Sequence, residues 1–199
     1  MAKYQTLYDG ISKTAWGYFF LYFNINLGTV SILPSFVGYI LFLQTIKILE
    51  DEERELALLK TLGTILAVWN FVEWVASWFS YSFGNQWHFI NIIIGLINLY
   101  FHFQLITNLA SIATKYQQDG YEQDKKLLRY RTIQTIMLTV FLIMSSFSLV
   151  FNEVWVYSSI ALAIVYVVVC VCLMKALFDL RKCLKTDEEI QANENIIDT

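Results

Sequence analysis

Proline and glycine, the residues that most often interrupt helices, are scarce in this sequence. The 199 residues include one proline and eight glycines, which leaves little material for turns or flexible linkers. The alternation of apolar and polar residues that marks a membrane β-barrel is also absent. We therefore expect one helical domain over residues 1–185, followed by an acidic tail over residues 186–199.

Charged side chains are missing from most of the chain. Residues 61–114 and 132–174 contain no lysine or arginine, and 57% of all residues are hydrophobic. Apolar runs of about 20 residues are the length that a helix needs to cross a bilayer. This composition excludes a soluble domain, and the lack of a basic face argues against nucleic acid as a partner. The sequence predicts an all-α, multi-pass integral membrane protein in contact with a lipid bilayer.

The 14 basic residues predict how the chain is oriented. All of them lie in residues 3–13, 47–60, 115–131 and 175–185. Because basic segments stay on the cytoplasmic side of a membrane, these four segments are expected to share that side. Both termini are then cytoplasmic, and we expect insertion in the plasma membrane.

Six membrane segments satisfy this orientation. The first two are expected to form a short helical hairpin, interrupted near Asn24, Asn26 and Thr29 and restarted at Pro34. Five spans are the second choice, because that count places Lys3 and Lys13 outside. The predicted segments are Ser12 to Asn26, Pro34 to Leu49, Thr61–Phe83, Trp87–Thr114, Thr132–Val150 and Val154–Leu180. The predicted outward turns are Gly84-Asn85-Gln86 and Phe151-Asn152-Glu153, and residues 115–131 are predicted as the longest polar loop.

Groups that bind metals or cofactors are also few. The chain has two histidines and three cysteines. Cys170 and Cys172 are two residues apart and therefore do not share a helix face. No phosphate-binding glycine loop, HExxH motif or CxxC motif is present. We predict no metal, no cofactor and no catalytic residue.

Glu73 stands out because it lies near the centre of an apolar segment that has no basic residue. A carboxylate at that depth needs a partner, a wet cavity or a proton. We expect the neighbouring antiparallel helix to bring His102 to a similar depth. Three polar residues share a face of each helix at helical spacing. The predicted polar seam consists of Asn70, Glu73, Ser77, Asn91, Asn98 and His102.

Two functions from different classes fit this seam. The favoured hypothesis is a small transporter or channel-like protein that moves a small solute or an ion, with a second copy of the chain completing the path if one copy is too short. The alternative is a non-catalytic subunit or sensor, in which a neutral Glu73 only holds two helices together. An enzyme acting on a lipid is the least favoured of the functions considered.

Overall fold

The computed structural model describes residues 3–23, 26–27, 30–31, 34–79, 87–146 and 154–190. The predicted turns at 84–86 and 151–153, the interrupting residues Asn24 and Thr29, and the tail beyond residue 190 lie outside these ranges. The described elements are α1 (Lys3–Tyr22), β1 (Asn26–Leu27), β2 (Val30–Ser31), α2 (Ser35–Leu49), the 3-10 helix η1 (Arg54–Leu58), α3 (Leu59–Trp78), α4 (His88–Tyr116), α5 (Gln123–Ser146) and α6 (Val154–Lys182).

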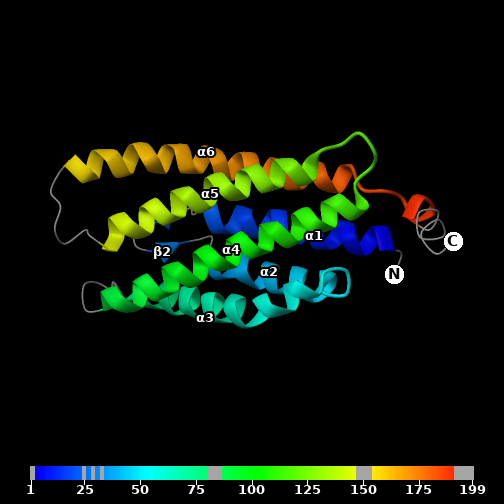
Figure 1. Cartoon of the computed structure of the whole chain (residues 1–199). Helices are drawn as coiled ribbons and strands as arrows, with labels where there is room; N and C mark the ends of the chain where they lie inside the picture. The colour runs from blue at the N-terminus through cyan, green and yellow to red at the C-terminus, as the bar shows by residue number, and fades with distance from the viewer. Residues whose placement is uncertain are drawn as a thin grey trace.

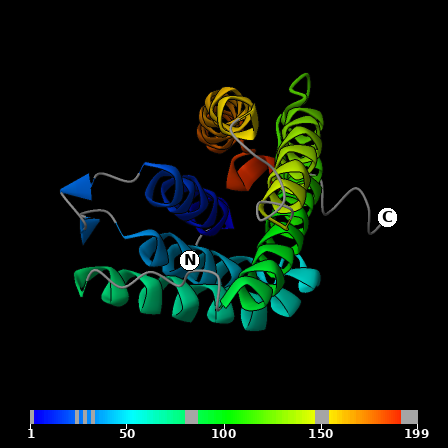
Figure 2. The same cartoon turned by 90° about the vertical axis from the view of Figure 1, so that its left-hand side faces the viewer.

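The helices form an elongated all-α bundle whose members run along one long axis (Figure 1). Viewed from one end, α3 and α2 lie below α1, α4 and α5 line one side, and α6 lies above (Figure 2). The two short strands pair antiparallel, with Asn26 opposite Ser31 and Leu27 opposite Val30. They join α1 to α2, which confirms the predicted helical hairpin.

Within the described part of the chain, four helices are long and apolar enough to cross a membrane. They comprise Arg54–Trp78, His88–Tyr116, Gln123–Ser146 and Ile160–Lys182, and only 17% to 28% of each apolar window is buried inside the bundle. The rest of each window is available to lipid. α2 is a shorter apolar helix of 15 residues, and α1 carries polar residues over its first half. Membrane crossing by α1 and α2 therefore stays a prediction.

Large apolar side chains lie on the outside of the bundle, where they are available to contact lipid. Phe89 is 74% exposed, and a row on α6 is about half exposed along its length. Soluble monomers do not leave contiguous apolar surfaces of this extent open to water. The α6 row consists of Ile160, Ile164, Val165, Val167, Val168 and Val171.

Several predicted helix boundaries were wrong, and those at the polar ends of α1, α4 and α5 share one reason. α1 begins at Lys3, not near Ser12, and the predicted loop 115–131 is mostly helical because α4 continues to Tyr116 and α5 begins at Gln123. The apolar pattern marks the part of a helix that lipid or core can cover, whereas polar residues can extend the same helix into water. Between α4 and α5, Gly120 has φ +89°, the left-handed region that glycine adopts without strain.

All four basic segments meet at one end of the bundle. The start of α1, the end of α6, the α2–α3 connection and the α4–α5 connection lie together there (Figure 1). The acidic segment between α2 and η1 is tied to α4 at this end: the Tyr116 hydroxyl donates to Glu52 at 2.6 Å, and Ser111 donates to Glu53 at 2.7 Å. Ion pairs join Lys115 to Glu53 at 3.2 Å and Lys3 to Glu52 at 3.7 Å.

α1 and α2 pack at backbone distance. A Cβ atom added to Gly38 would lie 2.6 Å from the carbonyl oxygen of Gly17, so only glycine fits there. Along the same interface the Thr45 hydroxyl contacts the Gly10 carbonyl at 3.1 Å and the Thr14 hydroxyl at 3.2 Å. Small residues that permit close approach, with hydroxyls bonding across the contact, are typical of helix pairs inside membranes.

The first prediction concerns this contact. Gly38→Ala should lower the stability of the purified protein by about 1–3 kcal/mol, because the neighbouring backbone cannot move aside as a side chain can. Gly63→Ala is the matched control, since its added Cβ would meet the ends of the Leu43 and Phe101 side chains at 3.0 and 3.1 Å. Thermal unfolding in detergent measures both variants. An unfolding temperature for Gly38→Ala equal to that of the wild type would contradict the backbone contact.

The second prediction concerns Glu53. Partial burial acts to raise the pKa of Glu53, but hydrogen bonds from Ser111 and Lys115 and the charge of Lys115 outweigh burial and lower it below the usual glutamate value. A lowered pKa stabilises the folded state at neutral pH, and this stabilisation is lost as the pH falls through the folded-state pKa. Glu53→Gln should therefore be less stable at neutral pH and should lose part of the acid dependence. Chemical unfolding of both proteins over a range of pH measures the free energy of unfolding. If the pH dependence of that free energy is the same in Glu53→Gln as in the wild type, the prediction is contradicted.

Candidate functional site

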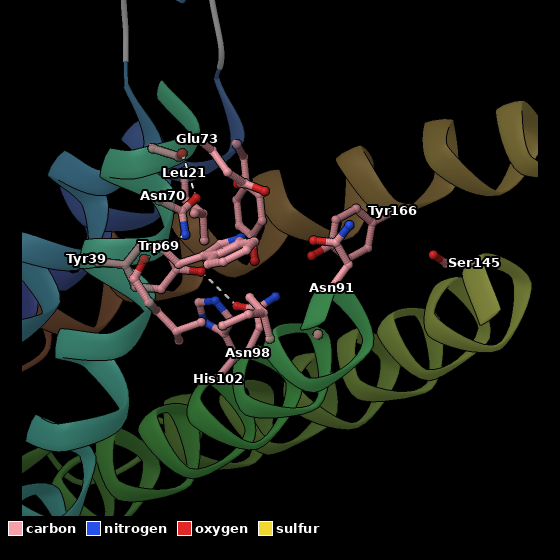
Figure 3. Close-up of a pocket in the computed structure, with 15 residues that line it drawn as sticks. Leu21, Tyr39, Trp69, Asn70, Glu73, Asn91, Asn98, His102, Ser145 and Tyr166 are labelled. Carbon is pink, nitrogen blue, oxygen red and sulfur yellow. Dashed lines mark hydrogen bonds between the residues drawn. The ribbon is translucent and has the colours of Figure 1, made fainter. Parts of the chain in front are cut away.

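A pocket of about 580 Å³ lies among the six α-helices, all of which contribute to its described lining. Its lining comes from the last turn of α1, the start of α2, the second half of α3, the first half of α4, and single residues of α5 and α6 (Figure 3). The pocket therefore lies in the half of the bundle away from the basic end. The described lining consists of Leu21, Tyr22, Ser35, Tyr39, Leu66, Trp69, Asn70, Glu73, Asn91, Ile94, Gly95, Asn98, His102, Ser145 and Tyr166.

The deepest part of the pocket is built around His102. Its ring is 2% exposed, and its Nδ1 lies 3.1 Å from the hydroxyl of Tyr18. The rings of Tyr18, Phe42, Phe101 and Tyr39 surround it with centroid distances of 5.4, 5.7, 5.4 and 6.1 Å. This aromatic layer closes the pocket toward the basic end of the bundle.

One polar atom in this layer has no partner. His102 Nε2 is buried and makes no hydrogen bond within the described part of the chain. Buried polar atoms are almost always paired, because leaving one unpaired costs about 1–3 kcal/mol. Since His102 lines the pocket, a molecule held there can supply the missing hydrogen bond.

The α2, α3 and α4 side of the pocket is organised by amide side chains. The Tyr39 hydroxyl donates to Asn98 Oδ1 at 2.7 Å, and the Ser35 hydroxyl donates to Asn70 Oδ1 at 2.8 Å (Figure 3). Asn70 also donates to the backbone carbonyl of Leu66 at 2.8 Å. These bonds fix the amides and tie α3 and α4 to α2 at the pocket, so the lining is held in place before any ligand arrives.

Glu73 contributes a carboxylate to the same lining. Its side chain is exposed, and Trp69, one turn earlier on α3, donates a hydrogen bond to it. Glu73 is the only acidic residue in the described lining, and none of the chain's 14 lysines and arginines, all of which are described, lines the pocket. The pocket therefore presents negative charge without a built-in cation.

The α6 side is formed by Tyr166. In the close-up, Tyr166 and Asn91 lie together, across from the group of Tyr39, Asn98 and His102 (Figure 3). Tyr166 bonds with Tyr22 and Gln134, and Gln134 donates to the Tyr22 hydroxyl. These bonds link α1, α5 and α6 behind the pocket wall.

Five of the six predicted seam residues line the pocket, namely Asn70, Glu73, Asn91, Asn98 and His102. Ser77 is outside the lining, and its hydroxyl donates to the Trp74 carbonyl at 2.6 Å in its own helix. The structure thus brings most of the predicted polar residues together, while their functional role stays a hypothesis.

The predicted pairing of Glu73 with His102 does not form. His102 bonds with Tyr18, its other nitrogen is unpaired, and Glu73 bonds with Trp69. Gly63 lies against Phe101, and this antiparallel register places Glu73 near the level of Asn91. That level is about 16 Å from His102 along α4, at 1.5 Å per residue. The prediction failed because it matched Glu73 and His102 by their depth within their segments, whereas the contact of Gly63 with Phe101 sets a different register.

Sequence reasoning missed the tyrosines and Ser35. Tyr22, Tyr39 and Tyr166 each place a hydroxyl at the pocket or in its wall. Tyrosines in apolar segments could have pointed to the pocket, because a buried tyrosine hydroxyl needs a hydrogen-bond partner. The chain contains 12 tyrosines in all, however, and periodicity alone cannot say which of them converge.

The described residues contain no cluster of three or more histidine, cysteine, aspartate or glutamate side chains that could hold a metal ion. Cys170 and Cys183 are buried free cysteines, and Cys172 is a partly buried one. The pocket is therefore equipped for hydrogen bonding, for aromatic contact and for holding one positive charge.

No protein-family model matches the chain, and comparison with curated proteins and with solved structures gave no match either. The geometry of the pocket is thus the basis on which function can be argued. Helix length and hydropathy support a multi-pass membrane protein.

The third prediction tests whether water reaches the pocket. In a variant with the three native cysteines replaced, Asn91→Cys should react quickly with a small water-soluble thiol reagent in lipid nanodiscs, because the thiolate forms only where water is present. Ile136→Cys is the matched control on the neighbouring helix, since Ile136 is 58% exposed but is outside the described pocket lining, so that we expect lipid to cover it. Equal and slow labelling of both cysteines would show that the pocket is dry.

Proposed function

We propose that this chain binds a small polar solute in the central pocket and moves it across the membrane, as a small transporter or channel-like protein. The observation that carries the proposal is a polar pocket enclosed by helices whose outer faces are apolar. At about 580 Å³ it has the size of a small-molecule site, for which roughly 300–1,000 Å³ is usual.

A purely structural role accounts for part of the lining but not for all of it. The Tyr39–Asn98 and Ser35–Asn70 bonds tie helices together, as polar side chains do inside membranes. Glu73 bonds only within its own helix among the contacts described, and its side chain stays exposed. A carboxylate at membrane depth is costly unless it faces water or a ligand, which favours a wet, functional pocket.

We infer that access to the pocket is one-sided. Its lining reaches the helix ends opposite the basic segments, while the aromatic layer around His102 closes the other direction. With the basic end assigned to the cytoplasm by the distribution of lysine and arginine, the pocket faces outward. Transport then requires the helices around His102 to separate, as in the alternating access of membrane carriers.

The fourth prediction is a flux measurement. Proteoliposomes should take up at least one member of a panel of urea, glycerol, glycine, ethanolamine and choline faster than protein-free vesicles. Asn91→Trp should return that flux to background, because an indole side chain fills much of a pocket of this size. Ile136→Trp, which enlarges an exposed residue of α5 outside the described pocket lining, should keep the flux.

Two outcomes would count against transport. If no panel member moves faster than in protein-free vesicles, the proposal fails and the subunit or sensor alternative gains support. If flux occurs but Asn91→Trp leaves it unchanged, the solute does not pass through this pocket.

A further inference from the structure

We infer that the ligand of the central pocket carries a single ammonium group, either as a free organic cation or as the headgroup of a lipid. The inference rests on the proposed function and names the class of molecule bound. It is carried by the charge of the lining, by its aromatic rings and by the unpaired buried nitrogen of His102.

The charge of the lining selects a cation. Glu73 is the single acidic residue of the described lining, and every lysine and arginine of the chain lies elsewhere. An anionic ligand would meet a carboxylate with no cation to offset it, and such like-charge contacts are strongly unfavourable. One carboxylate also matches one positive charge, so a monocation is favoured over a dication.

Aromatic rings in the pocket lining suit an ammonium group in particular. Trp69 bonds to Glu73, and Tyr22, Tyr39 and Tyr166 line the same pocket. Ring faces attract ammonium groups, and the attraction is strongest where water is excluded. Quaternary ammonium groups, which cannot donate N–H bonds, depend most on such rings.

The His102 end of the pocket, away from Glu73, fits the neutral part of the ligand. Asn98 and His102 lie there without any charged neighbour in the described lining, and His102 Nε2 has no partner. The level of Glu73 is about 16 Å from that of His102 along α4, so a short cation occupies the outer part while water or a longer polar ligand reaches His102. An unpaired buried nitrogen at the floor is independent evidence that the pocket holds a molecule.

The test compares choline with 3,3-dimethylbutan-1-ol, which has the same shape without the charge. Isothermal titration of the full-length protein in a neutral detergent should show choline binding at least about tenfold more tightly than the uncharged isostere, a factor that corresponds to about 1.4 kcal/mol. This comparison uses the wild-type protein and does not depend on any variant folding.

Two variants then test whether the Glu73 carboxylate is the group that recognises the positive charge of choline. Glu73→Gln should abolish the preference for choline over the isostere. Glu122→Gln is the matched control, because Glu122 is an exposed acid whose partner is Lys125, on the α4–α5 side of the basic end, and it should keep the preference. Unfolding temperatures of both variants establish that they are folded.

Nanodiscs separate the two sources of the ammonium group. If the headgroup of a lipid is the natural occupant, free choline binds more weakly in phosphatidylcholine nanodiscs than in phosphatidylglycerol nanodiscs. If the ligand is a free cation, its affinity is the same in both, and either result supports the inference.

Equal or tighter binding of the isostere, no binding of choline, or a preference that survives Glu73→Gln would overturn the ammonium inference. The proposed function would still stand if the flux of a neutral solute remained sensitive to Asn91→Trp. Loss of that flux, by contrast, removes the proposed function itself.

Discussion

The backbone contact between Gly17 and Gly38 is the constraint on which the rest of the structure depends. A Cβ atom at either position would clash with the partner helix, so these glycines set the distance between α1 and α2. The residues that follow them are Tyr18 and Tyr39, whose hydroxyls bond with His102 and Asn98. Close approach of two helices therefore fixes the aromatic floor of the pocket and holds α4 against it.

The pocket above that floor results from how the longer helices are joined. At the basic end, η1 and the acidic segment before it are tied to α4 by Ser111, Lys115 and Tyr116. At the other end, α1, α5 and α6 are linked through Tyr22, Gln134 and Tyr166. Polar side chains at membrane depth are costly unless they are paired or wet. The polar groups of the pocket walls are paired with one another, whereas the Glu73 carboxylate and His102 Nε2 remain available to a molecule in the interior of the pocket.

The sequence was sufficient to predict the fold class and the α1–α2 hairpin. Hydropathy identifies lengths of helix that lipid can cover, and Pro34 marks where α2 begins. The same signal could not place the helix ends beyond the membrane, as in residues 115–131, because polar residues extend helices there without changing the apolar pattern.

The candidate site was predictable only in part, for a related reason. Unusual polar residues in apolar segments pointed to Asn70, Glu73 and His102, all of which line one pocket. Their pairing depends on the register of α3 against α4, and the register set by Gly63 and Phe101 places Glu73 about three helical turns from His102, near the level of Asn91. The contributions of α1, α2 and α6 arise from tertiary packing, which periodicity does not encode.

The central claim is that the interior of this membrane bundle is wet and open to small polar molecules. Hydroxyl-radical footprinting in lipid nanodiscs tests it directly, because the radicals form in water and modify accessible aromatic rings. Trp69 and Tyr166, which line the pocket, should be oxidised, whereas Tyr100, which is 51% exposed and which we expect lipid to cover, should be protected. Protection of Trp69 and Tyr166 to the level of the fully buried Tyr18 would contradict the account.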